Sequence, residues 1–454
     1  GGGFSSFAYD FVNAQEVQVT VAGGMGEVDR GGPAFNIIPK SGGNNFSGTA
    51  FLSTAGEWSQ GSNLDDYLRS VGITEPPGLI KNWDTNLAVG GPIKRDRIWF
   101  FNNLRSYGTH QTIPGLSPNA NALDPSKWNY VRDTNTQARS AGDKKIEAFR
   151  VTGQLTQKNK LGFYYDYQAN CAGSALVNSG GDACRGRGDD WIALGTTTTS
   201  PESANMWPER EKITQATWTS PATNRILMEA GFSSFSSKWG GYPPPGSQTG
   251  LVAVTEQSTA AGVPVPNFIY HGWNSAAQNN QQHNIWRASL AYVTGAHSFK
   301  VGYQAAHEVY RQYQNADNQL AYTFNNGTPT QFTMRIAPHI QSNRTRYDGF
   351  YVQDQWTHNR LTVQAALRYE HAWSWFPEGE NGITADNRFG STYMFPRQDG
   401  VTGFHDITPR MGAAYDLFGN GKTSLKVNFS KYLETAQNGG LYTIANPAVT
   451  YQQT

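Results

Sequence analysis

The sequence predicts an all-β fold built around a large antiparallel sheet, and three observations lead to this prediction. Glycine accounts for 49 of the 454 residues and aromatic residues for 13%. Charged residues make up only 16%, well below the roughly 25% of soluble domains. Apolar and polar residues alternate with the period of two that a strand requires. Alternating segments are joined in pairs by short turns, which is the pattern of β-hairpins.

The strand LTVQAALRYE, residues 361–370, shows the alternation most clearly. Leu361, Val363, Ala365, Leu367 and Tyr369 fall on one face, and polar residues dominate the other. It follows the strand YDGFYVQDQW through the turn THNR. Five more hairpins of the same kind are predicted around the turns 91–96, 157–160, 221–224, 293–296 and 418–422. Counted from Phe46, the chain has thirteen predicted strands.

Long polar excursions separate the hairpins, at roughly 109–146, 170–210, 236–282, 311–345 and 372–408. Regular alternation of short turns and long loops is typical of outer-membrane barrels. Aromatic residues such as Trp99, Trp356 and Trp373 lie near strand ends, as in the girdles of such barrels. No run of about 18 apolar residues occurs, which excludes a helical span. We therefore expect a transmembrane β-barrel; a soluble sandwich or propeller is the alternative.

Little in the sequence supports an enzyme, a metal site or a cofactor site. It contains no HExxH, CxxC, EF-hand or GxSxG motif, and the net charge of +1 does not favour nucleic acid as a partner. Lys40-Ser41 follows glycines, but Pro39 stands where a phosphate loop needs glycine. The two cysteines, Cys171 and Cys184, predict one small disulfide loop, with two free thiols as the alternative.

Four segments in a fixed order resemble the TonB-dependent receptors of the Gram-negative outer membrane. They read NIIPKSGGNNFSGTAF, LAVGGPIKRDRIWFFNNL, FYVQDQWTHNRLTVQAALRYE and ITPRMGAAYDLFGNGKTSLKVNFSKY. The Oar-like branch, whose members often carry a carboxypeptidase-regulatory-like domain, is the most similar. The resemblance implies a barrel of about 22 strands closed by an N-terminal plug. Residues 1–45 would then be the C-terminal part of the plug and 46–454 the N-terminal part of the barrel, so we expect this chain to be a fragment.

The resemblance also implies roles for particular residues. The pattern that ends the family's plug is matched at Gly31, Gly32, Asn36, Lys40, Ser41, Gly42, Asn44, Phe46 and Gly48, and Pro39 departs from it. In a barrel, charged residues on the polar strand faces would line the lumen; the candidates are Arg287, Lys300, Arg368, Glu370 and Lys426.

The function implied is a receptor that moves a bulky ligand, such as a peptide, a glycan or a siderophore, across the outer membrane. The expected partners are outer-membrane lipid and lipopolysaccharide, the periplasmic TonB protein and an extracellular ligand. A structural or adhesive surface protein without energised transport is the alternative. A TonB box and a full plug upstream of these residues would distinguish the two.

Overall fold

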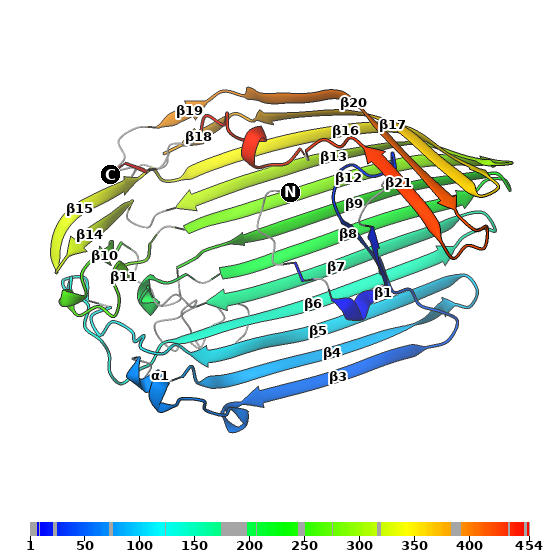
Figure 1. Ribbon diagram of the computed structural model, residues 1–454. Coiled ribbons are helices and arrows are strands. Elements are labelled where there is room, and N and C mark those ends of the chain that lie inside the picture. The colour runs from blue at the N-terminus through cyan, green and yellow to red at the C-terminus, as the bar shows by residue number, and fades with distance from the viewer. Residues whose placement is uncertain are drawn as a thin grey trace.

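A computed structural model describes residues 7–8, 10–20, 25–71, 76–122, 124–173, 198–205, 207–243, 250–274, 276–315, 319–382, 392–434, 436–448 and 452–453. Its main feature is a sheet of 13 antiparallel strands, each hydrogen-bonded to the next of the sheet along the chain (Figure 1). The strands are β3 (Ser47–Gly56), β4 (Leu79–Lys94), β5 (Ile98–Thr112), β6 (Arg139–Gln154), β7 (Lys160–Gly173), β8 (Trp207–Pro221), β9 (Ile226–Gly240), β12 (Ala276–Thr294), β13 (His297–Asn315), β16 (His339–His358), β17 (Leu361–Phe376), β20 (Gln398–Asp416) and β21 (Ser424–Ser430). The all-β class and the count of thirteen strands are confirmed.

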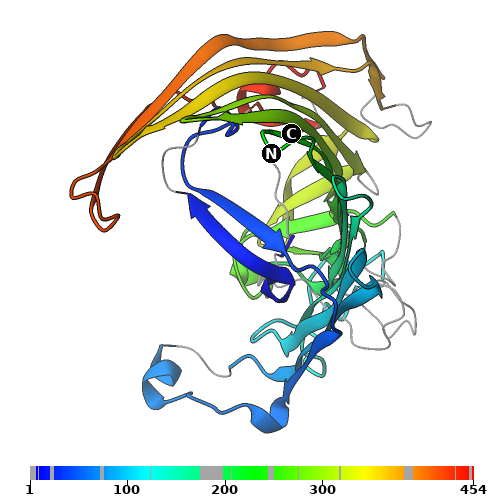
Figure 2. The same ribbon diagram turned by 90° about the vertical axis from the view of Figure 1, so that its right-hand side faces the viewer.

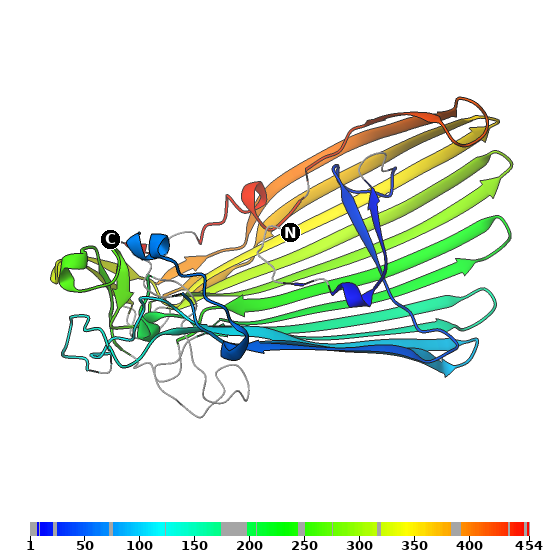
Figure 3. The ribbon, with the colours of Figure 1, turned by 60° about the horizontal axis from the view of Figure 1, so that its bottom comes forward.

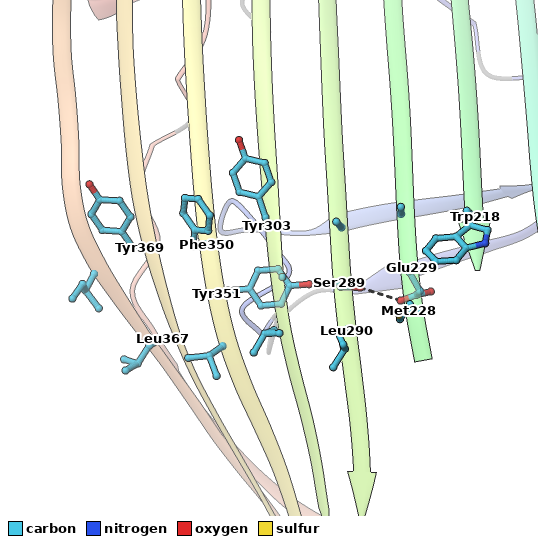
Figure 4. A pocket seen from close by; sticks show the side chains of 16 residues that line it. Trp218, Met228, Glu229, Ser289, Leu290, Tyr303, Phe350, Tyr351, Leu367 and Tyr369 are labelled. Atoms are coloured by element: carbon cyan, nitrogen blue, oxygen red, sulfur yellow. Dashed lines mark hydrogen bonds between the residues drawn. The ribbon is translucent and has the colours of Figure 1, made fainter. Parts of the chain in front are cut away.

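The sheet is strongly curved, with a convex and a concave side (Figure 2), and the strand alternation makes the convex face apolar and the concave face polar. On β17, Leu367 and Tyr369 are 52% and 39% exposed on the convex face, whereas Arg368 and Glu370 are buried on the concave face. Figure 4 shows part of the convex face, where apolar side chains of neighbouring strands surround a shallow hollow of about 770 Å³. An exposed apolar face of this kind suits contact with lipid.

The strands are longer than the alternation predicts, because they continue into the ends of the predicted excursions. The segment 276–284, AAQNNQQHN, belongs to β12, although polar residues occupy both of its faces. Beyond the apolar band both faces of a strand are hydrated, so the alternation disappears while the ladder of backbone hydrogen bonds continues. The six short turns lie at one end of the sheet, and the excursions lie at the other (Figure 3).

The N-terminal segment lies in the concavity of the sheet (Figures 2 and 3). It consists of the 3₁₀ turn η1 (Phe11–Asn13) and an antiparallel pair, β1 (Ala14–Thr20) and β2 (Ala34–Pro39). The first five residues of the predicted strand EVQVTVAGG, 16–20, belong to β1, and its last four lie outside the described residues. Pro39 is the last residue of β2, a position where a missing N–H group interrupts no ladder.

The excursions contain structure that the sequence did not indicate. β10 (Ala253–Glu256), β11 (Phe268–Tyr270), β14 (Leu320–Asn325), β15 (Thr328–Arg335) and β22 (Gln452–Gln453) form a second sheet of five strands, which we call the excursion sheet. Its core includes Val254, Phe268 and Tyr270, together with Leu116 from another excursion. The remaining elements are η2 (Glu57–Ser59), α1 (Asp66–Ser70), η3 (Pro201–Ser203), η4 (Thr259–Ala261), β18 (Gly379–Asn381), β19 (Tyr393–Phe395) and η5 (Gly440–Tyr442).

None of the helices in the described ranges combines the length and the apolar character that a membrane span requires.

Candidate functional site

The concave face holds the N-terminal segment through a cluster of buried charges on β17 and β20, with a tyrosine from β16 beside them. The Arg368 side chain donates from Nε to Glu370 Oε1 at 2.9 Å and from Nη1 to the carbonyl oxygen of Gly26 at 2.8 Å. Tyr347 donates its hydroxyl to Glu370 Oε1 at 2.8 Å. The side chains of Arg368 and Glu370 are 0% and 1% exposed. Glu370 holds the buried Arg368 guanidinium in place. The guanidinium in turn fixes the position of the Gly26 backbone through its hydrogen bond to the carbonyl oxygen.

Arg410 on β20 extends this cluster to the next residues of the segment. Its Nη1 donates to the carbonyl oxygens of Met25, at 2.8 Å, and Val28. Its guanidinium lies 4.2 Å from the ring centroid of Tyr432, a cation–π contact, and its Nη2 is 3.9 Å from Glu370 Oε1. Three backbone carbonyls of the turn 25–28 are therefore held by two buried guanidinium groups of the 13-stranded sheet, which we call the wall.

A second set of contacts holds the start of the segment against β4 and β5. Asp10, which is 3% exposed, accepts hydrogen bonds from Asn103 Nδ2 at 2.9 Å and from Arg105 Nη1 at 3.2 Å. Arg105 also makes a bidentate pair with Asp84, at 2.9 and 2.8 Å. The start of the N-terminal segment and the turn between β1 and β2 are thus tied to different parts of the curved sheet, at β4 and β5 and at β17 and β20.

The predicted junction motif lies where β2 leads into β3, against the turn between β4 and β5. A Cβ added at Gly42 would lie 2.1 Å from Phe100 O and 2.7 Å from Gly91 O, so only glycine fits there. Asn44 accepts hydrogen bonds from the backbone N–H of Asp96 at 2.9 Å and from Trp99 Nε1 at 2.8 Å. These two residues bring the chain into contact with the wall.

The other motif residues lie nearby and differ in their contacts. Gly32 has a φ of +96°, a conformation that favours glycine. Asn36 donates from Nδ2 to Gln18 Oε1 at 3.3 Å, which links β2 to β1. Lys40 donates its backbone N–H to Asn13 O at 2.6 Å. The remaining members are Gly31, beside the Tyr432 ring, Ser41, which is exposed, Phe46, whose ring centroid is 6.3 Å from that of Phe100, and Gly48, beside Ala88 O.

The five residues proposed from the sequence for a lumen share one face of the sheet. The ladder register aligns Arg287 with Glu370 through β13 and β16, and it places Lys300, Arg368 and Lys426 on the same concave face. Lys300 Nζ lies 2.7 Å from Glu27 Oε2 of the N-terminal segment. Arg287 and Lys426 are exposed.

Sequence reasoning missed Arg410, Tyr347 and Asp10. Arg410 lies on the polar face of PRMGAAYDL, so the alternation alone would have placed it beside Arg368 and Glu370. No feature of the sequence around Asp10 indicates its contacts with the wall. Cys171 is buried at the end of β7, whereas Cys184 lies outside the described residues, so their disulfide stays a prediction.

The excursion sheet carries a buried carboxyl group near its edge. Glu202 accepts hydrogen bonds from the backbone N–H of His271, at 3.2 Å, and from the Ser200 hydroxyl. Burial raises the pKa of Glu202 above its ordinary value, and these hydrogen bonds oppose the shift. Trp128 stacks on the His271 ring with 4.4 Å between centroids. In the part of the chain that the structure describes, no group of three or more His, Cys, Asp or Glu residues is arranged to hold a metal ion.

Comparison with known proteins gives matches of two kinds. The chain is 23% identical over 502 residues to the TonB-dependent transporter Oar of Myxococcus xanthus, an alignment that covers 95% of this chain and 44% of Oar. It resembles in fold the ferripyoverdine receptor of Pseudomonas aeruginosa, with a TM-score of 0.52, 14% identity and coverage of 93% of this chain and 47% of the receptor. The outer membrane transporter YddB of Escherichia coli also resembles it in fold, with a TM-score of 0.55 and 11% identity. That alignment covers 93% of this chain and 56% of YddB.

A family model described as "Outer membrane beta barrel domain" matches residues 109–454, three quarters of the chain. The chain spans about half the length of the relatives it matches. By their names, these relatives are a TonB-dependent transporter, a ferripyoverdine receptor of the outer membrane and an outer membrane transporter. The chain belongs to the family that this model describes, the outer membrane beta barrel domain.

Proposed function

We propose that this chain works in a TonB-dependent receptor that moves a bulky ligand across the outer membrane. The observation that carries the proposal is the position of the N-terminal segment, which lies inside the curved sheet. It is held there by hydrogen bonds from Arg368 and Arg410 to the carbonyls of Met25, Gly26 and Val28. A wall that binds an internal segment through a few strong contacts can release it as a unit when a partner pulls.

In this proposal, residues 1–45 are the C-terminal part of a plug and residues 46–454 the N-terminal part of the barrel. The separate pairing of β1 with β2 and the start of the 13-stranded sheet at Ser47 support the boundary. Gly42 and Asn44 would anchor the connection, and Arg287, Lys300, Arg368, Glu370 and Lys426 would line the lumen. The periplasmic TonB protein would supply the pull, while outer-membrane lipid and lipopolysaccharide would surround the convex face.

The ligand would be captured by the excursions before the plug moves. Solved proteins with a similar fold include receptors for ferripyoverdine and alcaligin and the ferric citrate transporter. These support a ligand of siderophore size, and peptides and glycans of similar bulk fit the same route.

A removable disulfide between segment and wall tests this function. A Cβ built on Gly26 lies 3.0 Å from Tyr351 Cβ, which is near the separation that a disulfide requires, about 3.5–4.5 Å. Cells with the Gly26→Cys, Tyr351→Cys variant should leave the ligand in the medium, as a deletion strain does, and a reductant should restore its removal. Mass-spectrometric profiles of the spent medium from these strains reveal the compound that is removed, whatever its chemical class.

The control is a disulfide within the wall, Ala230→Cys with Ala288→Cys, because these residues are directly paired on β9 and β12. It should leave ligand removal unchanged. Removal of the ligand at the wild-type rate by the oxidised Gly26–Tyr351 variant would contradict the proposal. A loss of surface adhesion on deletion, without any change in the medium, would favour the adhesive alternative.

A further inference from the structure

The chain leaves the 13-stranded sheet after β21 and returns along its concave face. β21 pairs with β20 only from Ser424 to Ser430, and the Lys431 amide makes one more bond, to the Pro409 carbonyl at 3.0 Å. From there the chain passes through η5 toward the excursions, on the inner side of the wall (Figures 1 and 2). We call residues 431–448 the inner segment, of which 431–434 and 436–448 are described.

The beginning of the inner segment touches the N-terminal segment. The ring of Tyr432 lies 4.2 Å from the guanidinium of Arg410, the group that holds two carbonyls of the turn 25–28. A Cβ built on Gly31 would lie 3.1 Å from Cδ2 of the same ring, so the ring packs directly on the Gly31 backbone. Tyr432 is therefore in contact both with the N-terminal segment and with an arginine that holds it.

The middle of the inner segment is bound to the concave face by a buried carboxylate and a buried hydroxyl. The Asn438 amide donates to Glu308 Oε2 at 3.0 Å, and the Asn438 side-chain oxygen accepts from Thr345 Oγ1 at 2.9 Å. His283 contacts the other oxygen of Glu308 at 2.9 Å. Asn438, Glu308 and Thr345 are 5%, 7% and 1% exposed, so water does not compete for these hydrogen bonds.

An apolar contact connects the inner segment to the ion pair that holds Gly26. Tyr442 is 4% exposed and lies in one apolar cluster with Ala372, against which Tyr347 packs. The Tyr347 hydroxyl donates to Glu370 at 2.8 Å and accepts from Arg368 Nε at 3.2 Å. The inner segment therefore reaches the N-terminal segment by two routes, one through each of the buried arginines.

The end of the inner segment lies at the excursion end of the wall. Asn446 donates from Nδ2 to the Ser342 carbonyl at 3.1 Å and to Asn343 Oδ1 at 2.6 Å. The Ala448 carbonyl accepts from His339 Nε2 at 3.0 Å. β22 follows along the chain and pairs with β15 of the excursion sheet. The inner segment thus connects a strand of the excursion sheet to the residues that hold the N-terminal segment.

The two ends of this connection are far apart. His339 marks the upper end on β16, and the register places Gln353 of the same strand in the row of Arg410. From residue 339 to residue 353 there are fourteen steps of about 3.4 Å, or about 48 Å in all. This distance is several Debye lengths at physiological salt. Any coupling between the two ends therefore has to pass through packed and hydrogen-bonded groups, and the inner segment supplies them.

We propose that the inner segment couples the excursion sheet to the contacts that hold the turn 25–31. A displacement of β22 with the excursion sheet is transmitted along the inner segment to Tyr432 and Tyr347, which contact the two arginines that bind the turn. The route runs over the concave face of the wall and does not involve β1 or β2. The coupling is a property of the chain without ligand, so it does not rest on the proposed transport.

Hydrogen exchange of the detergent-solubilised protein, measured by mass spectrometry without ligand, tests the coupling. Asn446→Ala removes the hydrogen bonds at the excursion end of the inner segment. It should speed amide exchange over residues 25–31 at least about fivefold, the low end of typical coupling between two sites. Residues 10–13 are held by Arg105 on another part of the wall and should exchange at the wild-type rate.

The matched control is Asn381→Ala. Asn381 is 1% exposed, and its side-chain oxygen accepts from the Ile340 amide at 2.7 Å. The variant therefore loses a buried hydrogen bond at the same end of β16, but at a residue outside the inner segment. Exchange over residues 25–31 should stay at the wild-type rate.

A milder variant gives the same test without the risk of misfolding. Thr345→Val keeps the shape of the side chain and removes the hydroxyl that donates to Asn438. It should speed exchange over residues 25–31 in the same direction, and it decides the question if Asn446→Ala does not fold.

The reverse experiment uses the reciprocity of coupling between two sites. Gly31→Ala adds a Cβ that meets the Tyr432 ring, so it should displace the inner segment and speed exchange of the Asn438 amide. Gly43→Ala is its control, because the Cβ added there has open space around it. That variant should leave the Asn438 amide unchanged.

Three results would overturn the proposal. One is wild-type exchange over residues 25–31 in the variants at Asn446 and Thr345. Another is an equal acceleration in Asn381→Ala or over residues 10–13, which would mean a general loosening of the wall. The third is wild-type exchange of the Asn438 amide in Gly31→Ala. Each of these results would leave the proposed transport standing, because the disulfide between segment and wall tests that function separately.

Discussion

Replacement of Glu370 by glutamine should destabilise the wall and release the turn 25–28 of the N-terminal segment. The carboxylate lies 2.9 Å from Arg368 Nε and 3.9 Å from Arg410 Nη2. At an effective dielectric constant of about 20, each contact corresponds to about 4–6 kcal/mol of Coulomb energy. The cost of desolvating the carboxylate offsets much of this, so the expected loss is about 3–5 kcal/mol. Both guanidinium side chains are fully buried, so water cannot replace the missing charge.

Two measurements check the Glu370 variant in detergent. Denaturant unfolding followed by tryptophan fluorescence gives the loss in unfolding free energy, and hydrogen exchange over residues 25–31 reports release of the segment. Asp399→Asn is the control, because Asp399 pairs with Arg397 at 3.6 Å on the exposed surface and should change neither. A Glu370→Gln variant with wild-type stability and wild-type exchange would refute the role given to the buried cluster.

Three further predictions concern single residues outside that cluster. Gly42→Ala should loosen the junction and raise protease sensitivity over residues 30–45, at a cost of about 1–3 kcal/mol, whereas Gly43→Ala, which has open space around it, should not. Asn44→Ala removes the hydrogen bonds to Asp96 and Trp99; it should cost about 1–2 kcal/mol and speed exchange of the Asp96 amide. Burial raises the pKa of Glu202, so the folded chain favours the protonated carboxyl group. The stability that this protonation contributes is complete below the ordinary pKa of glutamate and is lost as pH rises through the raised pKa. At high pH, hydrogen exchange of the His271 amide should therefore be faster in the wild type than in the Glu202→Gln variant. Identical pH profiles of this exchange in the two proteins would contradict the prediction.

The alternation of residues predicted the 13-stranded sheet because burial in lipid requires one apolar face along every spanning strand. The prediction of hairpins and turns depended on nothing but local sequence, and all six turns were found. Strand ends were placed too early, because beyond the apolar band both faces meet water. The excursion sheet escaped prediction for a different reason. Its strands are short, and β10 pairs in parallel with β14, a partner from another excursion that no local pattern identifies.

Prediction of the site was partial for similar reasons. Arg368 and Glu370 followed from their place on a polar strand face, although their burial did not, because the N-terminal segment that covers them is distant in the sequence. The glycines of the junction followed from the family resemblance, and their physical reason became visible only with the backbone atoms of Gly91 and Phe100. Contacts such as the one between Asp10 and Arg105 depend on how a segment sits in a concavity, which residue spacing does not encode.

The excursion sheet changes how this protein can be engineered. Four of its strands come from two excursions, 236–282 and 311–345, and β22 lies at residues 452–453. The Tyr270 hydroxyl donates to the Trp128 carbonyl at 3.0 Å, and backbone hydrogen bonds of the Ile269 and Ser200 amides connect the sheet to a further excursion. Grafting one loop from a relative would leave its former partners with exposed strand edges and an open core. Chimaeras intended to exchange ligand preference would have to transplant the whole set of excursions together, as one cassette.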